Sequence, residues 1–163
     1  MKRILSILMV MALLVVFGAF ALGSSESGSE DQGSDTATTA ESESNLGDFK
    51  VEILECRLAK DYEGKAVVIV KYKFTNNSDD TAAFYTAFDD NVYQDGVGLN
   101  ESYVVDDSAK YDSGNQTKEI KSGASIEVEA AFELNDTETD IDVEVEELFS
   151  FDDKKITKTF SIK

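Results

Sequence analysis

The sequence predicts an all-β domain, a two-sheet antiparallel sandwich of about seven to nine short strands, preceded by a signal segment and a disordered linker. From residue 48 onward, apolar and polar residues alternate, as they do along half-buried strands. Turn residues separate these stretches at short intervals, and no stretch has the spacing of an amphipathic helix. The alternative is an eight-stranded barrel.

Residues 1–23 have the pattern of an export signal. Lys2 and Arg3 precede an apolar run from Ile4 to Leu22, and Ala19-Phe20-Ala21 has the small-x-small pattern that signal peptidase recognises. We expect cleavage after Ala21 or Gly23. The alternative is a retained membrane segment, because a helix of this length nearly spans a hydrocarbon layer of ~30 Å. Both interpretations place the rest of the chain outside the cytoplasm, either secreted or associated with the membrane or cell surface.

Residues 24–47 predict a disordered linker. They include seven serines and six acids, no basic residue, and Leu46 as the only large apolar side chain. Such a segment buries too little apolar surface to offset a chain entropy of ~1–2 kcal/mol per residue. We therefore place the folded domain at residues 48–163.

The strands follow from the alternation within that domain. We expect strands at 49–58, 66–74, 82–88, 91–94, 97–99, 126–134, 141–145 and 156–162. A register shift near Cys56 predicts a β-bulge. Asp95-Gly96 is the two-residue sequence of a type I′ hairpin. Further turns are expected at 76–80, 121–123 and 152–154.

Composition excludes several classes of function. The formal charge of −18 becomes −20 without residues 1–23, and such a polyanion repels nucleic acids. The absence of histidine removes Ser-His-Asp catalysis and histidine-bound zinc. The single Cys56 excludes an intrachain disulfide; we expect it to be a small buried residue, with an intermolecular disulfide as the alternative.

Three motifs, in order, carry a resemblance to a known family. They are Phe74-Thr75-Asn76-Asn77-Ser78, Tyr93-Gln94-Asp95-Gly96-Val97, and Ile120-Lys121-Ser122-Gly123 leading into Phe132-Glu133-Leu134. In these the chain resembles uncharacterised Gram-positive surface lipoproteins with a shared domain of unknown function, similar to the immunoglobulin-like domain of immunoprotective extracellular proteins. The resemblance implies an immunoglobulin-like sandwich outside the membrane and no known activity. Ser122 replaces the usual proline, and the lipid-bearing cysteine is missing before Gly23.

Acidic residues suggest two hypotheses for chemistry. Asp140, Asp142, Glu144 and Glu146 alternate on one predicted strand, with Glu147 beside them, and Asp79-Asp80, Asp89-Asp90, Asp106-Asp107 and Asp152-Asp153 are expected at turns. They could bind Ca²⁺ or supply a hydrolytic carboxylate pair. Alternate strand positions lie ~6.5–7 Å apart, too far to converge on one ion. The competing interpretation is solvated charge that protects a sheet edge and local hydrogen bonding in turns.

Residues 100–116 form the longest stretch without clear alternation. Its candidate binding residues are Tyr103, Asp106, Asp107, Tyr111, Asp112 and Asn115. Tyrosine mixed with small polar residues is the composition of adaptable binding loops, and also of plain connections.

The sequence therefore favours a non-enzymatic extracytoplasmic binding or adhesion module for an unknown extracellular or cell-envelope protein. We expect a monomeric domain, no nucleic acid, no cofactor, and membrane contact only through an uncleaved N-terminal segment. The alternative is a calcium-binding or acid-pair hydrolytic surface protein.

Overall fold

The computed structural model describes residues 43–163, except residues 104 and 152. The predicted signal segment with its cleavage positions at Ala21 and Gly23, and most of the predicted linker, lie outside the described residues.

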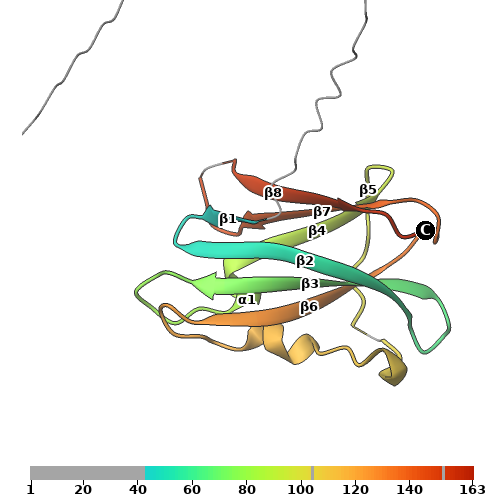
Figure 1. Cartoon of the computed structure of the whole chain (residues 1–163), viewed down its shortest axis with the longest axis horizontal. Coiled ribbons are helices and arrows are strands. Elements are labelled where there is room, and N and C mark those ends of the chain that lie inside the picture. Colours follow the sequence, from blue (N-terminus) through green and yellow to red (C-terminus); the bar gives the residue numbers. More distant parts are fainter. Residues whose placement is uncertain (1–42, 104, 152) are drawn as a thin grey trace, which may run out of the picture. The chain divides into compact units, whose positions relative to one another are not determined.

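The described chain forms two four-stranded antiparallel sheets, which confirms the predicted sandwich (Figure 1). One sheet has the order β1-β2-β3-β6 and the other the order β5-β4-β7-β8. The strands are β1 (Glu43–Leu46), β2 (Phe49–Lys60), β3 (Ala66–Asn76), β4 (Phe88–Gln94), β5 (Val97–Gly98), β6 (Ser125–Glu133), β7 (Ile141–Glu147) and β8 (Lys155–Phe160). A one-turn helix, α1 (Phe84–Ala87), and two 3-10 turns, η1 (Asp107–Ala109) and η2 (Ser113–Thr117), complete the fold. No helix in the described part of the chain is long and apolar enough to cross a membrane.

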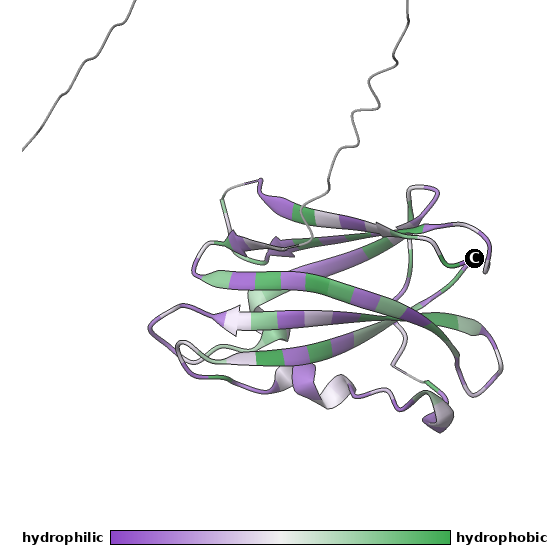
Figure 2. Ribbon diagram, viewed as in Figure 1, coloured by the Kyte–Doolittle hydropathy of each residue, from purple (hydrophilic) through white to green (hydrophobic). Residues whose placement is uncertain are grey.

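The core lies between the two sheets. Alternate residues of β3, from Val68 to Phe74, face inward and meet the buried residues of β7. Figure 2 shows the same alternation of apolar and polar residues along the strands. Phenylalanines from β2, β3, α1 and β4 pack edge to face at one end of this core, and Tyr72 stacks on Phe84 with ring centroids 5.1 Å apart.

The predicted hairpin turn and the predicted β-bulge are both confirmed. Asp95 and Gly96 join β4 to β5 with φ values of 49° and 73°, and the type I′ hairpin requires positive φ at both positions. The β2–β3 register shifts between Ile53 and Glu55, where the bulge was expected. The carbonyls of Ile53 and Leu54 at this bulge accept hydrogen bonds from Lys158 Nζ of β8 at 2.9 and 2.8 Å, which ties the two sheets together.

Two predicted elements need correction. The strand expected at 82–88 is a single bridge at Ala82 followed by α1, because Phe84, Ala87 and Phe88 are buried at helical spacing while the chain crosses between sheets. The described fold also begins before residue 48. Leu46 is only 2 % exposed, and β1 pairs with β2 from Glu43 to Leu46, so one apolar residue and a sheet edge order the end of the predicted linker.

Candidate functional site

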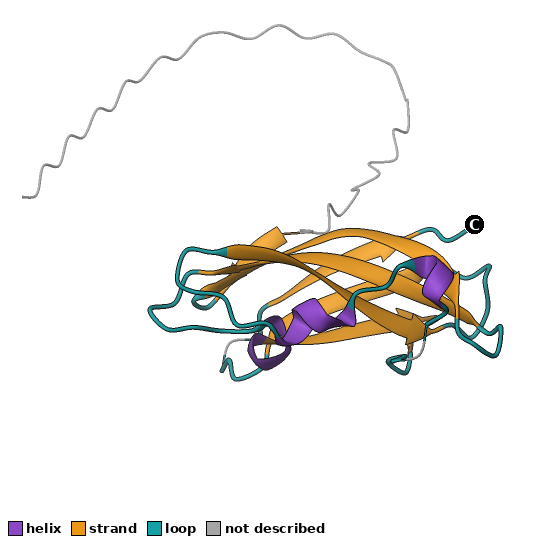
Figure 3. Ribbon diagram, turned by 90° about the horizontal axis from the view of Figure 1, so that it is seen from below, coloured by secondary structure: helices purple, strands orange, loops and turns teal. Residues whose placement is uncertain are grey.

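The loop predicted as a binding surface mainly covers the free edge of β6. Ser102 N donates to Ala131 O at 2.7 Å, and Gln116 Nε2 donates to Glu129 O at 2.7 Å. Asn115 Nδ2 likewise donates to Glu127 O at 3.1 Å. Figures 1 and 3 show η1 and η2 running along this side of the sandwich. The loop thereby occupies hydrogen-bonding groups that an open edge strand would present to another chain.

The other candidate residues of this loop also make local contacts. Asp106 and Asp112 cap η1 and η2 by accepting hydrogen bonds from Ser108 N and Gly114 N. Hydrogen bonding by the Ser108 side chain, and then by its backbone N–H, lowers the pKa of Asp106. Asp107 accepts from Tyr62 Oη at 2.7 Å. Tyr111 packs on the outer face of β3, whereas Tyr103 is 72 % exposed. The structure thus brings four of the six candidates, Tyr103, Asp106, Asp107 and Tyr111, to one hollow of about 340 Å³, whereas Asp112 and Asn115 do not line it.

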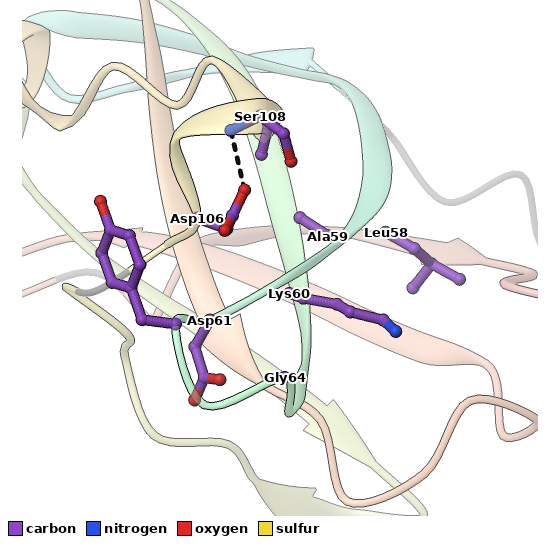
Figure 4. A pocket seen from close by; sticks show the side chains of 9 residues that line it. Leu58, Ala59, Lys60, Asp61, Gly64, Asp106 and Ser108 are labelled. Carbon is purple, nitrogen blue, oxygen red and sulfur yellow. Dashed lines mark hydrogen bonds between the residues drawn. The ribbon is translucent and has the colours of Figure 1, made fainter.

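A shallow hollow of about 630 Å³ lies between the β2–β3 turn and η1. Its acids hold the local backbone: Asp61 Oδ1 accepts from Glu63 N and Lys65 N, both at 2.8 Å, and Asp106 Oδ1 accepts from Ser108 N at 2.9 Å. Figure 4 shows Asp106 turned toward Ser108, while Leu58 and Lys60 point away from it. These contacts explain the acids by turn geometry alone.

A second hollow, of about 460 Å³, lies where β4 faces β6 across the side of the sandwich. We call it the Asp90 hollow. Its lining residues are Tyr85, Phe88, Asp89, Asp90, Asn91, Leu99, Asn100, Glu101, Tyr103, Gln116, Phe132 and Leu148. It is open because β5 pairs only with Tyr93 and Gln94 and leaves the first residues of β4 uncovered by that strand. None of the described residues that line it is basic.

Asp90 lies on the inward-facing side of β4 with an unpaired oxygen. Phe88, Val92 and Gln94, at alternate positions of the same strand, are all buried. Asp90 Oδ2 is also buried and makes no hydrogen bond of good geometry, although the Tyr72 hydroxyl lies close enough to interact with this carboxylate. An unpaired buried acceptor lowers the stability of the folded state, so its presence in a native protein points to a role other than stability.

Gln94 lies four residues after Asp90 on the same face of β4, and it illustrates a buried polar side chain whose role is structural. Its Nε2 donates to Thr139 O at 3.0 Å and to Asp136 O at 3.3 Å, while its Oε1 accepts from Asn135 N at 2.8 Å. Gln94 therefore holds the 135–139 connection and is satisfied by it. Asp90 has no comparable set of partners for Oδ2, although both residues face the interior.

Electrostatics around Asp90 disfavour its negative charge. Burial raises the pKa of Asp90 to about 7, hydrogen bonding by the Tyr72 hydroxyl opposes this rise, and the negative charge of Glu101 adds to it. The Tyr72 and Tyr111 hydroxyls are likewise buried without a hydrogen bond of good geometry, although Tyr72 interacts with Asp90 and Tyr111 with the backbone of Ala131. Burial is the main cause of the raised pKa of both tyrosines, and Glu101 also contributes to both. The Asp90 region therefore combines unpaired polar atoms with excess negative charge.

Two tyrosines contribute to the lining of the Asp90 hollow, and both are largely exposed. Tyr85 on α1 is 60 % exposed, and the hydroxyl of Tyr103 donates to Glu101 at 2.5 Å. Aromatic faces attract organic cations, and carboxylates accept hydrogen bonds from such cations. Chemically, the hollow is thus suited to hold an ammonium or guanidinium group.

The sequence interpretation missed Asp90 because it assigned Asp89-Asp90 to a turn. The pair lies within β4. The available signal was the alternation itself: extending it backward from Val92 places Asp90 on the apolar face, where a carboxylate is unusual. The interpretation failed because it assigned residues 82–88 to a strand and ended that strand just before Asp89.

The row of acids on β7 faces outward and is partly matched by β8. Glu144 pairs with Lys155 Nζ at 2.7 Å, and Asp142 accepts from Thr159 Oγ1 at 2.6 Å. Among the described residues, no group of three or more His, Cys, Asp or Glu side chains is placed to hold a metal ion. Cys56 is half-buried beside the core, and burial raises the pKa of its thiol.

Comparison with known proteins returned one match. A family profile described as "Domain of unknown function (DUF5067)" matches residues 24–147, which include β1 to β7 and all lining residues of the Asp90 hollow except Leu148. No curated protein and no solved structure matches the chain.

Proposed function

We propose that this chain, which belongs to the DUF5067 family of unknown function, is a non-enzymatic binding module outside the cytoplasm whose Asp90 hollow takes up a cationic group of its partner. The observation that carries the proposal is the buried, unpaired Oδ2 of Asp90 in a hollow without a basic lining residue. The partner is an extracellular or cell-envelope protein.

A cation supplies both things that the Asp90 region needs. An ammonium or guanidinium group brings hydrogen-bond donors to the Asp90 carboxylate, and its positive charge offsets the negative charges of Asp90 and Glu101. The two oxygens of a carboxylate share one charge, so a cation in the hollow meets that charge at either oxygen. A neutral donor would supply the hydrogen bond and leave the electrostatic repulsion in place.

The placement outside the cytoplasm rests on the sequence of residues 1–23. The three sequence motifs at 74–78, 93–97 and 120–134 support kinship with Gram-positive surface lipoproteins, although the lipid-bearing cysteine is missing from its expected position. The strand order supports the immunoglobulin-like part of the proposal. β2-β3-β6 opposite β5-β4-β7-β8 has the order A-B-E opposite C′-C-F-G, and the Glu101–Phe132 bridge takes the place of strand D beside E.

Titration with amino-acid amides tests the proposal. Nα-acetyl-lysine amide and Nα-acetyl-arginine amide are added to the ¹⁵N-labelled chain and followed by NMR. Nα-acetyl-norleucine amide serves as the neutral analogue of similar shape. We expect chemical-shift changes around Asp90, Glu101 and Gln116 with the two cationic amides only.

Two variants make the titration specific. Asp90→Asn keeps the shape of the side chain and should remove the response, whereas Asp79→Asn, an exposed acid in the β3–α1 connection, should leave it unchanged. Equal responses to the neutral and cationic amides, or responses in Asp90→Asn that match those of the unmodified chain, would overturn the proposal.

A further inference from the structure

The connection between β7 and β8 exposes three large apolar side chains. Phe149 is 81 % exposed, Phe151 is fully exposed and Leu148 is 43 % exposed. We call Leu148, Phe149 and Phe151 the aromatic turn. Single exposed apolar residues are ordinary, but a cluster at the tip of a hairpin marks an interaction surface. The two sheets bury their core without these phenylalanine rings.

The aromatic turn is continuous with the Asp90 hollow. Leu148 belongs to both, and its backbone N–H donates to Ala87 O at 2.9 Å, which fixes the start of the turn against α1. The exposed ring of Tyr85, also on α1, lines the same hollow. One surface therefore combines an apolar tip with a pocket whose charged lining residues, Asp89, Asp90 and Glu101, are all acidic.

Resting on the proposed function, we infer that the partner of this surface is a polypeptide segment with a lysine or arginine next to large apolar side chains. The cationic side chain enters the Asp90 hollow, and the neighbouring apolar side chains pack on the aromatic turn. Buried aromatic contacts supply much of the affinity at protein interfaces, and matched charges supply specificity.

Charge complementarity favours a polypeptide over a lipid surface. The chain carries a formal charge of −18, and acids line the hollow beside the turn, so an anionic membrane would repel this face. A zwitterionic membrane could accept the phenylalanines but would make no use of Asp90. A basic and apolar peptide contacts both halves of the surface.

Four synthetic peptides and the purified full-length chain test the inference. The first peptide has a central lysine flanked by leucine and phenylalanine. The second replaces the lysine by glutamine, the third replaces the flanking residues by serine, and the fourth makes both changes. Affinities are measured for the unmodified chain, for Asp90→Asn, and for the double variant Phe149→Ser with Phe151→Ser. Val97→Ser, an exposed apolar residue on β5, is the matched control.

The expected result is a crossed pattern. The first peptide binds the unmodified chain about tenfold or more tightly than either single-change peptide, and the Val97→Ser variant behaves like the unmodified chain. Asp90→Asn weakens only the lysine peptides, and the phenylalanine variant weakens only the peptides with apolar flanks. The phenylalanines are exposed, so folding of that variant is checked by its NMR spectrum before binding is compared.

Two outcomes separate failure of the inference from failure of the proposed function. If Asp90→Asn weakens the lysine peptides but the phenylalanine variant binds all peptides normally, the cation site stands and the inference falls. If neither variant changes binding of any peptide, both fall. The chain is also mixed with phosphatidylcholine vesicles. If the phenylalanine variant loses binding to the vesicles but still binds the peptides normally, the polypeptide partner is overturned in favour of a lipid surface.

Discussion

Three inward-facing polar side chains in this sandwich show how burial distinguishes a structural group from a functional one. The Asn76 side chain donates to Asp80 O at 2.7 Å and to Ile120 O at 3.0 Å, and it accepts from Ser78 N at 3.0 Å. Gln94 is satisfied in the same manner by the 135–139 connection. Asp90 has an oxygen without a partner. A carboxylate retained in this state destabilises the fold.

Replacing Asp90 by asparagine should stabilise the folded chain most at high pH. The pKa of Asp90 is raised to about 7, above the ~3.9 of an unfolded aspartate, so the folded state holds its proton more tightly. The contribution of Asp90 to stability is therefore full below about pH 4 and is lost as the pH rises toward 7. Asparagine does not ionise and therefore avoids this loss of stability. The size of the pKa shift sets an upper bound of ~4 kcal/mol on the gain.

Urea unfolding at about pH 4.5 and about pH 8 measures this difference. The free energy of unfolding of Asp90→Asn should exceed that of the unmodified chain at the higher pH and approach it at the lower. Asp79→Asn provides the baseline for removal of an exposed acid. A gain of equal size at both pH values would show that Asp90 is not the titrating group.

At the scale of elements, the sequence predicted the features that depend on interactions between neighbouring residues. The turn at Asp95-Gly96 depends on backbone preferences of two residues, and the β6 strand depends on a regular alternation from Ile126 to Phe132. Both are confirmed. The bulge in β2 was also visible, because the apolar residues change phase there.

The elements that the sequence did not reveal are determined by distant contacts. β1 is ordered by pairing with β2 and by burial of Leu46, neither of which appears in the composition of a polar linker. α1 forms where the chain leaves β3 for the other sheet, and its two buried residues, Phe84 and Ala87, are too few to reveal a helical period in the sequence. The Asp90 hollow depends on how far β5 extends along β4, which no local pattern encodes.

Leu46→Ala should destabilise the domain if β1 belongs to the fold. Leu46 joins the main core cluster, and truncation of a buried leucine typically costs ~2–5 kcal/mol, with the lower end expected at an edge strand. Thermal unfolding measures the loss, and Ser44→Ala on the same strand, with a side chain that is only half-buried, is the control. Equal melting temperatures for the two variants would place β1 outside the cooperative unit.

At the scale of the whole molecule, the fold leaves one side of the sandwich incompletely closed. β5 is short, the 100–102 segment and η2 cover the edge of β6, and the Asp90 hollow lies between them. The opposite side is tied by Lys158 of β8 to the bulge of β2. The binding surface that we propose therefore follows from the unequal closure of the two sides.

The formal charge of −18 should make the stability of the whole chain depend on ionic strength and not on calcium in particular. Added salt screens self-repulsion and should raise the melting temperature. Ca²⁺ and Mg²⁺ at matched ionic strength should give the same melting temperature, and a chelator should have no further effect. A calcium site at 100 times its dissociation constant would add ~2.7 kcal/mol, so a selective rise with Ca²⁺ would revive the calcium hypothesis.

The most direct test is the pKa of Asp90 itself, measured from the ¹³C chemical shift of its carboxyl carbon during a pH titration. We predict a pKa near 7 for the free chain and a lower value in the presence of the peptide with a central lysine and apolar flanks, because a bound cation stabilises the carboxylate. The glutamine peptide should leave that pKa unchanged. An Asp90 pKa near 4 in the free chain, or one that the lysine peptide does not lower at saturation, would contradict the account.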